Sequence, residues 1–228
     1  MTRPAEKPLE PSASKADLVY RRLSTAILDG SMKPLARLNA DEIARRLGVS
    51  KIPVREALQR LEFQGLVTQA QHAGASVAPL SENEIEGIRY ARLALDPVVA
   101  RLAAERATPA LLANVRAVDD RMRRKIARGD TRGLEELNRD FHAAIARASG
   151  FELLADLVDA TLLRVRRYRA LVPLSPESWN IVLDEHASIV RAIAEHDAGA
   201  AERAARDHAS GPFTMGGPAF KPPPEFLA

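Results

Sequence analysis

Residues 39–78 constrain the fold of this chain more than any other stretch, because two short helical patterns meet there at a tight turn. In the first pattern Ile43, Ala44 and Leu47 lie on one stripe of a helix, and Gly48 supplies the backbone freedom that a helix end requires. Only a few residues separate this helix from the next one. The stretch therefore predicts a helix-turn-helix motif.

The second helical pattern has two distinct faces. Ser50 precedes it as a residue type that caps helices, and Pro53 falls in the first turn, where a missing N–H costs little. Its buried face is expected to carry Val54, Leu58 and Leu61. Its outer face repeats a polar residue every four positions, at Lys51, Arg55 and Gln59. An apolar anchor with a basic outer stripe is the arrangement of a helix that reads DNA bases.

The flanking segments complete a winged helix-turn-helix domain over residues 14–80. Ser14 and Asp17 have the spacing of a capping box and begin a supporting helix that ends at Gly30. Two short strands are expected at the other end of the domain, around a turn that contains His72 and Gly74; they span 66–70 and 76–79. Residues 1–80 hold 12 Lys/Arg against 8 Asp/Glu, a net charge of +4, and the remainder carries −1. This modest surplus supports a nucleic-acid partner only together with the motif.

Composition excludes several classes of protein. The chain has no cysteine, so disulfides and thiolate metal sites are ruled out. Residues 1–13 are polar and proline-rich and predict a flexible arm, with no apolar segment of signal-peptide length. No stretch approaches eighteen uninterrupted apolar residues. We therefore expect a cytoplasmic protein with no membrane partner.

The second half of the chain, residues 81–210, contains helical patterns and no convincing strand. Its helices are expected to begin at capping signals such as Ser81 with Glu84, and Thr108 before a proline. Residues 211–228 are rich in Gly and Pro and predict a disordered tail. The predicted fold class is mainly α, a winged helix-turn-helix followed by an all-α bundle.

Three segments of the first half resemble the DNA-binding domain of GntR-type bacterial transcription regulators: VYRRLSTAILDG, LARLNADEIARRLGVSKIPVREALQRLEFQGLV and HAGASVAPLS. The chain departs from the family at Leu35, where glycine is usual, so the loop there is expected to differ in shape. The resemblance implies an operator in double-stranded DNA, with base contacts from Lys51 and Arg55. The expected DNA-binding set is Arg45, Arg46, Ser50, Lys51, Arg55, Gln59, His72 and Gly74.

Three of the five histidines fall on different predicted helices near apolar stripes: His142, His186 and His208. Asn138 lies one turn before the first of them on the same helical face. Neutral imidazole suits Zn, Ni, Cu or Fe. Spacing alone favours three unrelated histidines over a shared site.

The segments NRDFHAAIARASG, LDEHASIVRAI and RDHA resemble the FCD domain, the helical effector domain of FadR-type GntR regulators. The resemblance implies a divalent metal, Zn or Ni, held by Asn138, His142, His186 and His208, with a small carboxylic acid as effector. Asparagine stands where the family more often has aspartate, which removes a negative charge and leaves the site more positive.

The segment RLALDPVVARLAAERA resembles the first helix of the same domain and makes Arg92 the candidate effector-binding residue. An equally weighted alternative is that Arg92 only pairs with Asp96, four residues on. The arginines of residues 164–169 are expected to be mostly solvated, with one turned into the cavity.

These features predict a ligand-responsive bacterial transcription regulator, a repressor that binds a near-palindromic operator as a homodimer. One alternative is a DNA-binding dimer whose helical domain only dimerises. Another is a metal-dependent enzyme, which is disfavoured because no nucleophile motif or well-placed general base accompanies the histidines.

Overall fold

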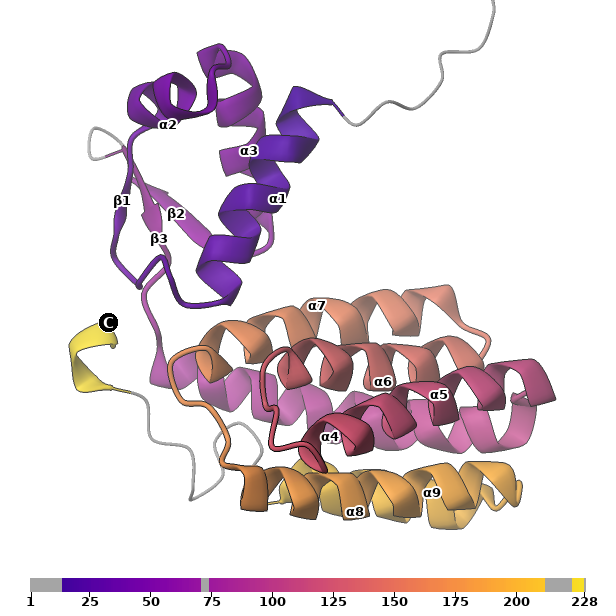
Figure 1. The fold of residues 1–228 in the computed structure, drawn as a ribbon. Helices are drawn as coiled ribbons and strands as arrows, with labels where there is room; N and C mark the ends of the chain where they lie inside the picture. The colour runs from indigo at the N-terminus through magenta and orange to yellow at the C-terminus, as the bar shows by residue number, and fades with distance from the viewer. Residues whose placement is uncertain (1–13, 71–73, 212–222, 228) are drawn as a thin grey trace, which may run out of the picture. The chain divides into compact units, whose positions relative to one another are not determined.

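The computed structural model describes residues 14–70, 74–211 and 223–227 (Figure 1). They form two compact units: the first holds residues 14–27 and 31–78, and the second holds residues 28–30 and those from 79 onward. The predicted flexible arm, residues 1–13, lies outside the described residues. None of the described helices combines the length and apolar character needed to cross a membrane.

The N-terminal unit is a winged helix-turn-helix. Its elements are α1 (Lys15–Leu28), β1 (Arg37–Leu38), α2 (Ala40–Leu47), α3 (Lys51–Phe63), β2 (Val67–Ala70) and β3 (Gly74–Val77). The sheet is antiparallel in the order β1-β3-β2. β2 and β3 are the two predicted wing strands, and β1 is a third, two-residue strand that pairs with β3 and that the sequence analysis did not predict. Its buried core includes Val19 and Leu23 of α1 and Val54 and Leu61 of α3.

Local signals set the ends of the first helices. Ser14 and Asp17 form the predicted capping box, in which each side chain accepts the backbone N–H of the other at 3.1 Å. Asn39 caps α2 by accepting from the backbone N–H groups of residues 41 and 42. Gly48 ends α2 in the left-handed conformation, with φ of 65°, which turns the chain toward α3.

Leu35 adopts the conformation for which glycine is suited, with φ of 67°. Its backbone N–H donates to the carbonyl of Val77 at 3.0 Å, so the loop keeps a left-handed residue despite the larger side chain. Leu35→Gly should remove this strain while losing little packing, because the side chain is 52% exposed. We expect the free energy of unfolding in urea to rise by about 0.5 to 1 kcal/mol. Leu35→Ala keeps the strain and is the control; equal stability of the two variants would contradict the prediction.

The C-terminal unit is an all-α bundle, as predicted. Its helices are α4 (Glu82–Arg106), α5 (Pro109–Ile126), α6 (Leu134–Ala148), α7 (Glu152–Arg169), α8 (Pro176–Ala194) and α9 (Ala198–Ser210). Figure 1 shows them packed roughly lengthwise against one another. The apolar stripes of α4, α5, α6 and α8 meet in one core around Phe141, which is fully buried. The bundle thus brings side chains from several helices to one interior.

The end of the predicted disordered tail is ordered. A short 3-10 helix, η1 (Pro224–Phe226), is followed by a parallel bridge between Leu227 and Leu80. The backbone N–H of Leu80 donates to the carbonyl of Phe226 at 2.8 Å, and both tail side chains pack on a small apolar cluster that includes Ile85. The prediction of disorder rested on the Gly and Pro content of the tail and did not anticipate the packing of Phe226 and Leu227. Residues 212–222 and 228 lie outside the described residues.

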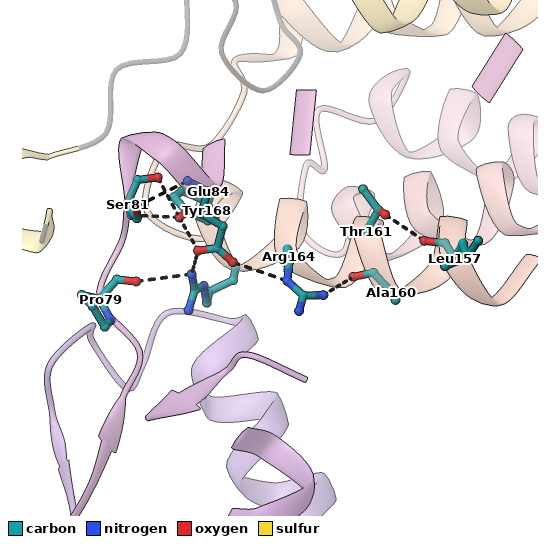
Figure 2. Close-up of polar contacts among 9 residues, drawn as sticks. Pro79, Ser81, Glu84, Leu157, Ala160, Thr161, Arg164 and Tyr168 are labelled. Carbon is teal, nitrogen blue, oxygen red and sulfur yellow. Dashed lines mark hydrogen bonds and ion pairs between the residues drawn. The ribbon is translucent and has the colours of Figure 1, made fainter. Parts of the chain in front are cut away.

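The start of α4 is held to α7 by a polar cluster (Figure 2). Ser81 accepts the backbone N–H of Glu84, as predicted, but Glu84 does not return the contact to the backbone of Ser81. Its Oε2 instead accepts from Arg167 at 2.5 Å and from the hydroxyl of Tyr168 at 2.6 Å. The hydroxyl of Tyr168 accepts the backbone N–H of Ser81 at 3.0 Å. A residue from a distant helix therefore completes this cap.

Tyr168→Phe should destabilise the C-terminal unit by about 1 to 3 kcal/mol, because it leaves the N–H of Ser81 without its acceptor in a part-buried place. Burial, followed by the hydrogen bond to Glu84, raises the pKa of Tyr168 to about 12, so the hydroxyl stays protonated as a donor. The measurement is urea unfolding. Tyr90→Phe is the matched control, since Tyr90 is 56% exposed, and should change stability by less than about 0.5 kcal/mol. An equal effect of both substitutions would count against the cluster.

Candidate functional site

The outer face of α3 has the polarity expected of a recognition helix. Lys51, Arg55 and Gln59 are all exposed, whereas the opposite face is buried. Arg55 and Gln59 line a groove of about 420 Å³ together with Gly74 of β3. The same groove contains Arg37 of β1, a cation that the sequence analysis missed because a two-residue strand has no detectable periodicity.

Lys51 is engaged within the protein. Its Nζ lies 2.9 Å from Oδ1 of Asp41, and this contact lowers the pKa of the carboxyl group. Both side chains are 57% exposed, so the ion pair is screened by solvent and is easily exchanged for a contact to DNA. Next to Lys51, Ile52 is 68% exposed and was also missed. An exposed apolar residue on this face is suited to contact a thymine methyl group.

Ser50 stands at the N-cap of α3, but its side chain makes no capping hydrogen bond, which corrects the prediction. A capping oxygen accepts from the second or third N–H of the helix, and the third position is Pro53, which has none. Arg45 and Arg46 are exposed on α2. His72 lies outside the described residues.

The second candidate site is a cluster of three histidines in the core of the C-terminal unit. His142 of α6, His186 of α8 and His208 of α9 are all buried, and each offers a ring nitrogen within 4.8 Å of the other two. Nε2 of His142 and Nε2 of His208 are 3.2 Å apart. The fold thus brings together the three histidines that sequence spacing alone left unrelated.

The environment keeps these imidazoles neutral. Burial lowers the pKa of His142 and His186 far below the usual value and that of His208 to about 3, and the charge of Arg92 acts in the same direction on all three. Neutral ring nitrogens present lone pairs, which a metal ion accepts.

Two observations test whether the donor set fits a metal. Both ring nitrogens of His186 are buried without a hydrogen-bond partner among the described residues, and such orphaned atoms cost free energy unless something pairs with them. Two nitrogens bound tetrahedrally to one Zn at about 2.0 to 2.1 Å would lie roughly 3.3 Å apart, close to the 3.2 Å between His142 and His208. The residues present therefore fit a divalent ion.

Neighbouring side chains orient the rings. Oε2 of Glu185 lies 2.7 Å from Nδ1 of His208, which directs Nε2 of that ring toward the cluster. Phe141 stacks on His186 with ring centroids 3.9 Å apart. Asn138 is buried, its Oδ1 has no partner in the described part of the chain, and it lines a small cavity with Arg92 and His208.

Arg92 pairs with Asp96, as one of the two interpretations predicted, and it also lies beside the histidine cluster. It forms a buried ion pair with Asp96 at 2.7 Å, and its Nη2 lies 3.3 Å from Nε2 of His142. Burial raises the pKa of Asp96, and the guanidinium opposes that shift. One guanidinium thus neutralises a buried carboxylate and faces the histidine cluster.

The sequence analysis missed or misjudged three charged residues of the C-terminal unit, two of which line this cavity. Arg167 and Arg169 are buried rather than solvated, and Arg169 lines the cavity, as expected of one arginine in its segment. Glu135 also lines the cavity, on the face of α6 that carries Asn138. Its spacing, three residues before Asn138, was the available signal.

Comparison with known proteins decides the family. The model of the FCD domain matches residues 88–211, and that of bacterial regulatory proteins of the gntR family matches residues 15–77. The chain is a GntR-family regulator with an FCD domain. The resemblance inferred from the sequence motifs is therefore confirmed, and these families are transcription regulators rather than enzymes.

Relatives of this GntR regulator extend over most of its length. It is 29% identical to the HTH-type transcriptional repressor RspR of Escherichia coli K12 over 89% of each chain. It is 27% identical to the repressor GlaR of the same organism, over 86% of this chain and 93% of the relative. The structure of E. coli McbR/YncC shares the fold, with a TM-score of 0.74 and 23% identity over 87% of this chain and 94% of that one.

Proposed function

We propose that the protein is a ligand-responsive repressor that binds a near-palindromic operator as a homodimer and responds to a small carboxylic acid bound at a metal in the helical domain. The observation that carries the proposal is the buried histidine cluster with Arg92 beside it. Neutral imidazoles suit a cation, and a guanidinium suits a carboxylate. A protein that only bound DNA would need neither.

On the DNA side, Lys51 and Arg55 are proposed to contact base edges. The exposed face and groove of α3 support this assignment. Ser50, Arg45 and Arg46 are proposed to contact phosphates, together with His72 and Gly74 of the wing, because such contacts position the helix without reading sequence.

Dimerisation is proposed because a two-fold dimer doubles both phosphate contacts and base readout. The helical unit exposes large apolar side chains on three of its helices, among them Val98 on α4, Leu153 and Leu157 on α7, and Ile181 on α8. Such residues are expected at an interface between copies of the chain.

The proposed metal ligands are Asn138, His142, His186 and His208. A bound divalent ion, with Zn or Ni favoured by the imidazoles, would supply positive charge for the carboxylate of the effector. Arg92 would hold that carboxylate through its guanidinium, and Asp96 would keep the guanidinium in place. The amide of Asn138 leaves this pocket more positive than a carboxylate would.

The size of the cavity links binding to regulation. It measures about 20 Å³ beside Arg92 and Asn138, room for about one water molecule, so an acid enters only when lining side chains move. Binding then favours one packing of the helices over another, to the extent of its differential affinity, and release from DNA is the expected outcome. The same small volume favours the alternative, a dimer whose helical domain has no effector.

Native mass spectrometry of the full chain, supplied with Zn²⁺ and then desalted, tests the proposal. We expect a dimer with metal retained on each protomer, and loss of that metal after chelation. A dimer that never takes up metal would favour the alternative, and a monomer would contradict the proposed operator geometry.

A further inference from the structure

Glu135 occupies a defined place beside the candidate effector cavity. It lies in the first turn of α6, one turn before Asn138 and two turns before His142, so the three side chains share one face of the helix. It lines the same cavity as Arg92 and His208. A group bound at the histidine cluster therefore has Glu135 as a near neighbour.

The carboxyl group of Glu135 is incompletely paired. Its Oε1 is buried and has no hydrogen-bond partner among the described residues, although part of the residue remains accessible. Leaving a buried acceptor unpaired costs free energy. Burial raises the pKa of Glu135 to about 7, and the charges of Arg169, Arg166 and Arg92 act against this. The site thus holds an acceptor that a ligand donor would satisfy.

A purely structural role does not account for this group. Acidic residues in the first turn of a helix interact favourably with its dipole, and Glu135 is one of two there. The other, Glu136, is exposed, and its Oε2 lies 3.6 Å from Nη2 of Arg166. Glu136 already supplies an acidic side chain for the helix dipole, so this role does not require Glu135. The half-buried position of Glu135 is better explained by the cavity that it lines.

We propose that Glu135 selects effectors that carry a hydroxyl or ammonium group next to the carboxylate. This inference rests on the proposed function, in which Arg92 and the metal hold the carboxylate. A hydroxyl or ammonium hydrogen donates to Oε1 of Glu135, whereas a C–H group leaves it unpaired and a second carboxylate meets like charge. The effector class is therefore a hydroxy or amino carboxylic acid.

The test is calorimetry of the Zn²⁺-loaded full-length protein with propionate, lactate and alanine, which differ only in bearing H, OH or NH3⁺ beside the carboxylate. We expect lactate and alanine to bind about 10- to 100-fold more tightly than propionate, the range that a satisfied buried acceptor supplies. Glu135→Ala should abolish both preferences. Glu135→Gln keeps a neutral acceptor and should lose the preference for alanine while retaining part of that for lactate. Glu136→Ala is the matched control and should change neither.

The outcomes separate this inference from the function on which it rests. Equal binding of the three acids to the wild type, or a preference that survives in Glu135→Ala, would overturn the role of Glu135 and leave the metal site intact. Zinc uptake without binding of any of the three acids would overturn the inference together with the acid effector. A protein that takes up no zinc would overturn the proposed metal site itself.

Discussion

Substitution of His186 with alanine is expected to lower the affinity for Zn²⁺ by about 100-fold or more, because it removes one of three converging ring nitrogens. In the wild type, Zn²⁺ at about 100 times its dissociation constant should stabilise the fold by about 2.7 kcal/mol, and this gain should vanish in the variant. The measurements are metal content after dialysis and thermal unfolding with and without Zn²⁺.

The same substitution at His196 is the matched control. Nδ1 of His196 lies 2.8 Å from the carbonyl of Ala104, away from the cluster, so His196→Ala should bind metal like the wild type. Because His186 is fully buried, His186→Asn is a second variant that leaves a smaller cavity. Both His186 variants should still bind DNA through the N-terminal unit. Unchanged zinc affinity in a folded His186 variant would rule out the proposed ligand set.

Replacement of Arg55 with alanine is expected to flatten the preference of the protein for its operator over other DNA. An arginine that contacts guanine with two hydrogen bonds contributes about 1 to 3 kcal/mol of discrimination, or roughly 5- to 150-fold. Arg55 is exposed on α3 and lines the groove beside β3, which is where such a contact would be made. Fluorescence anisotropy with an operator selected from random DNA, and with single-base variants of it, measures the effect.

Arg46→Ala separates base reading from general attraction. Arg46 is exposed on α2, where it is proposed to contact phosphate. Its loss should therefore lower the affinity for all DNA sequences by a similar factor and reduce the salt dependence of binding. Arg55→Ala should instead reduce the differences in affinity between DNA sequences. If Arg55→Ala keeps full discrimination between operator and random DNA, the proposed reading face is wrong.

Local patterns predicted the structure well wherever neighbouring residues set it. The capping box of Ser14 with Asp17 and the helix end at Gly48 both form as expected, because each depends on atoms within a few residues. The two faces of α3 also follow from its periodicity. At Leu35, where the loop was expected to differ in shape from that of the family, the backbone has φ above zero, the conformation to which glycine is suited.

Local patterns failed where a distant group intervened. The cap of α4 uses the hydroxyl of Tyr168, which lies 87 residues from Ser81 in the chain. Arginine is usually exposed, so Arg167 was predicted to be solvated, but it is buried and pairs with Glu84. The predicted side-chain cap by Ser50 failed for a reason that was partly open to prediction, since Pro53 removes one of the two backbone N–H groups that a capping side chain can accept from.

The same distinction between local patterns and contacts between distant residues applies to the candidate site. By itself the sequence determined the winged helix-turn-helix and the helical bundle, because helical periodicity and short motifs are properties of contiguous residues. Through motif resemblance it also singled out Asn138, His142, His186 and His208, which remain the proposed metal ligands. Only the tertiary structure decided that three histidines from α6, α8 and α9 converge, that Arg92 faces them while pairing with Asp96, and that Glu135 lines their cavity. These facts depend on how helices pack, and packing is set by side chains distant in the chain that no local pattern records.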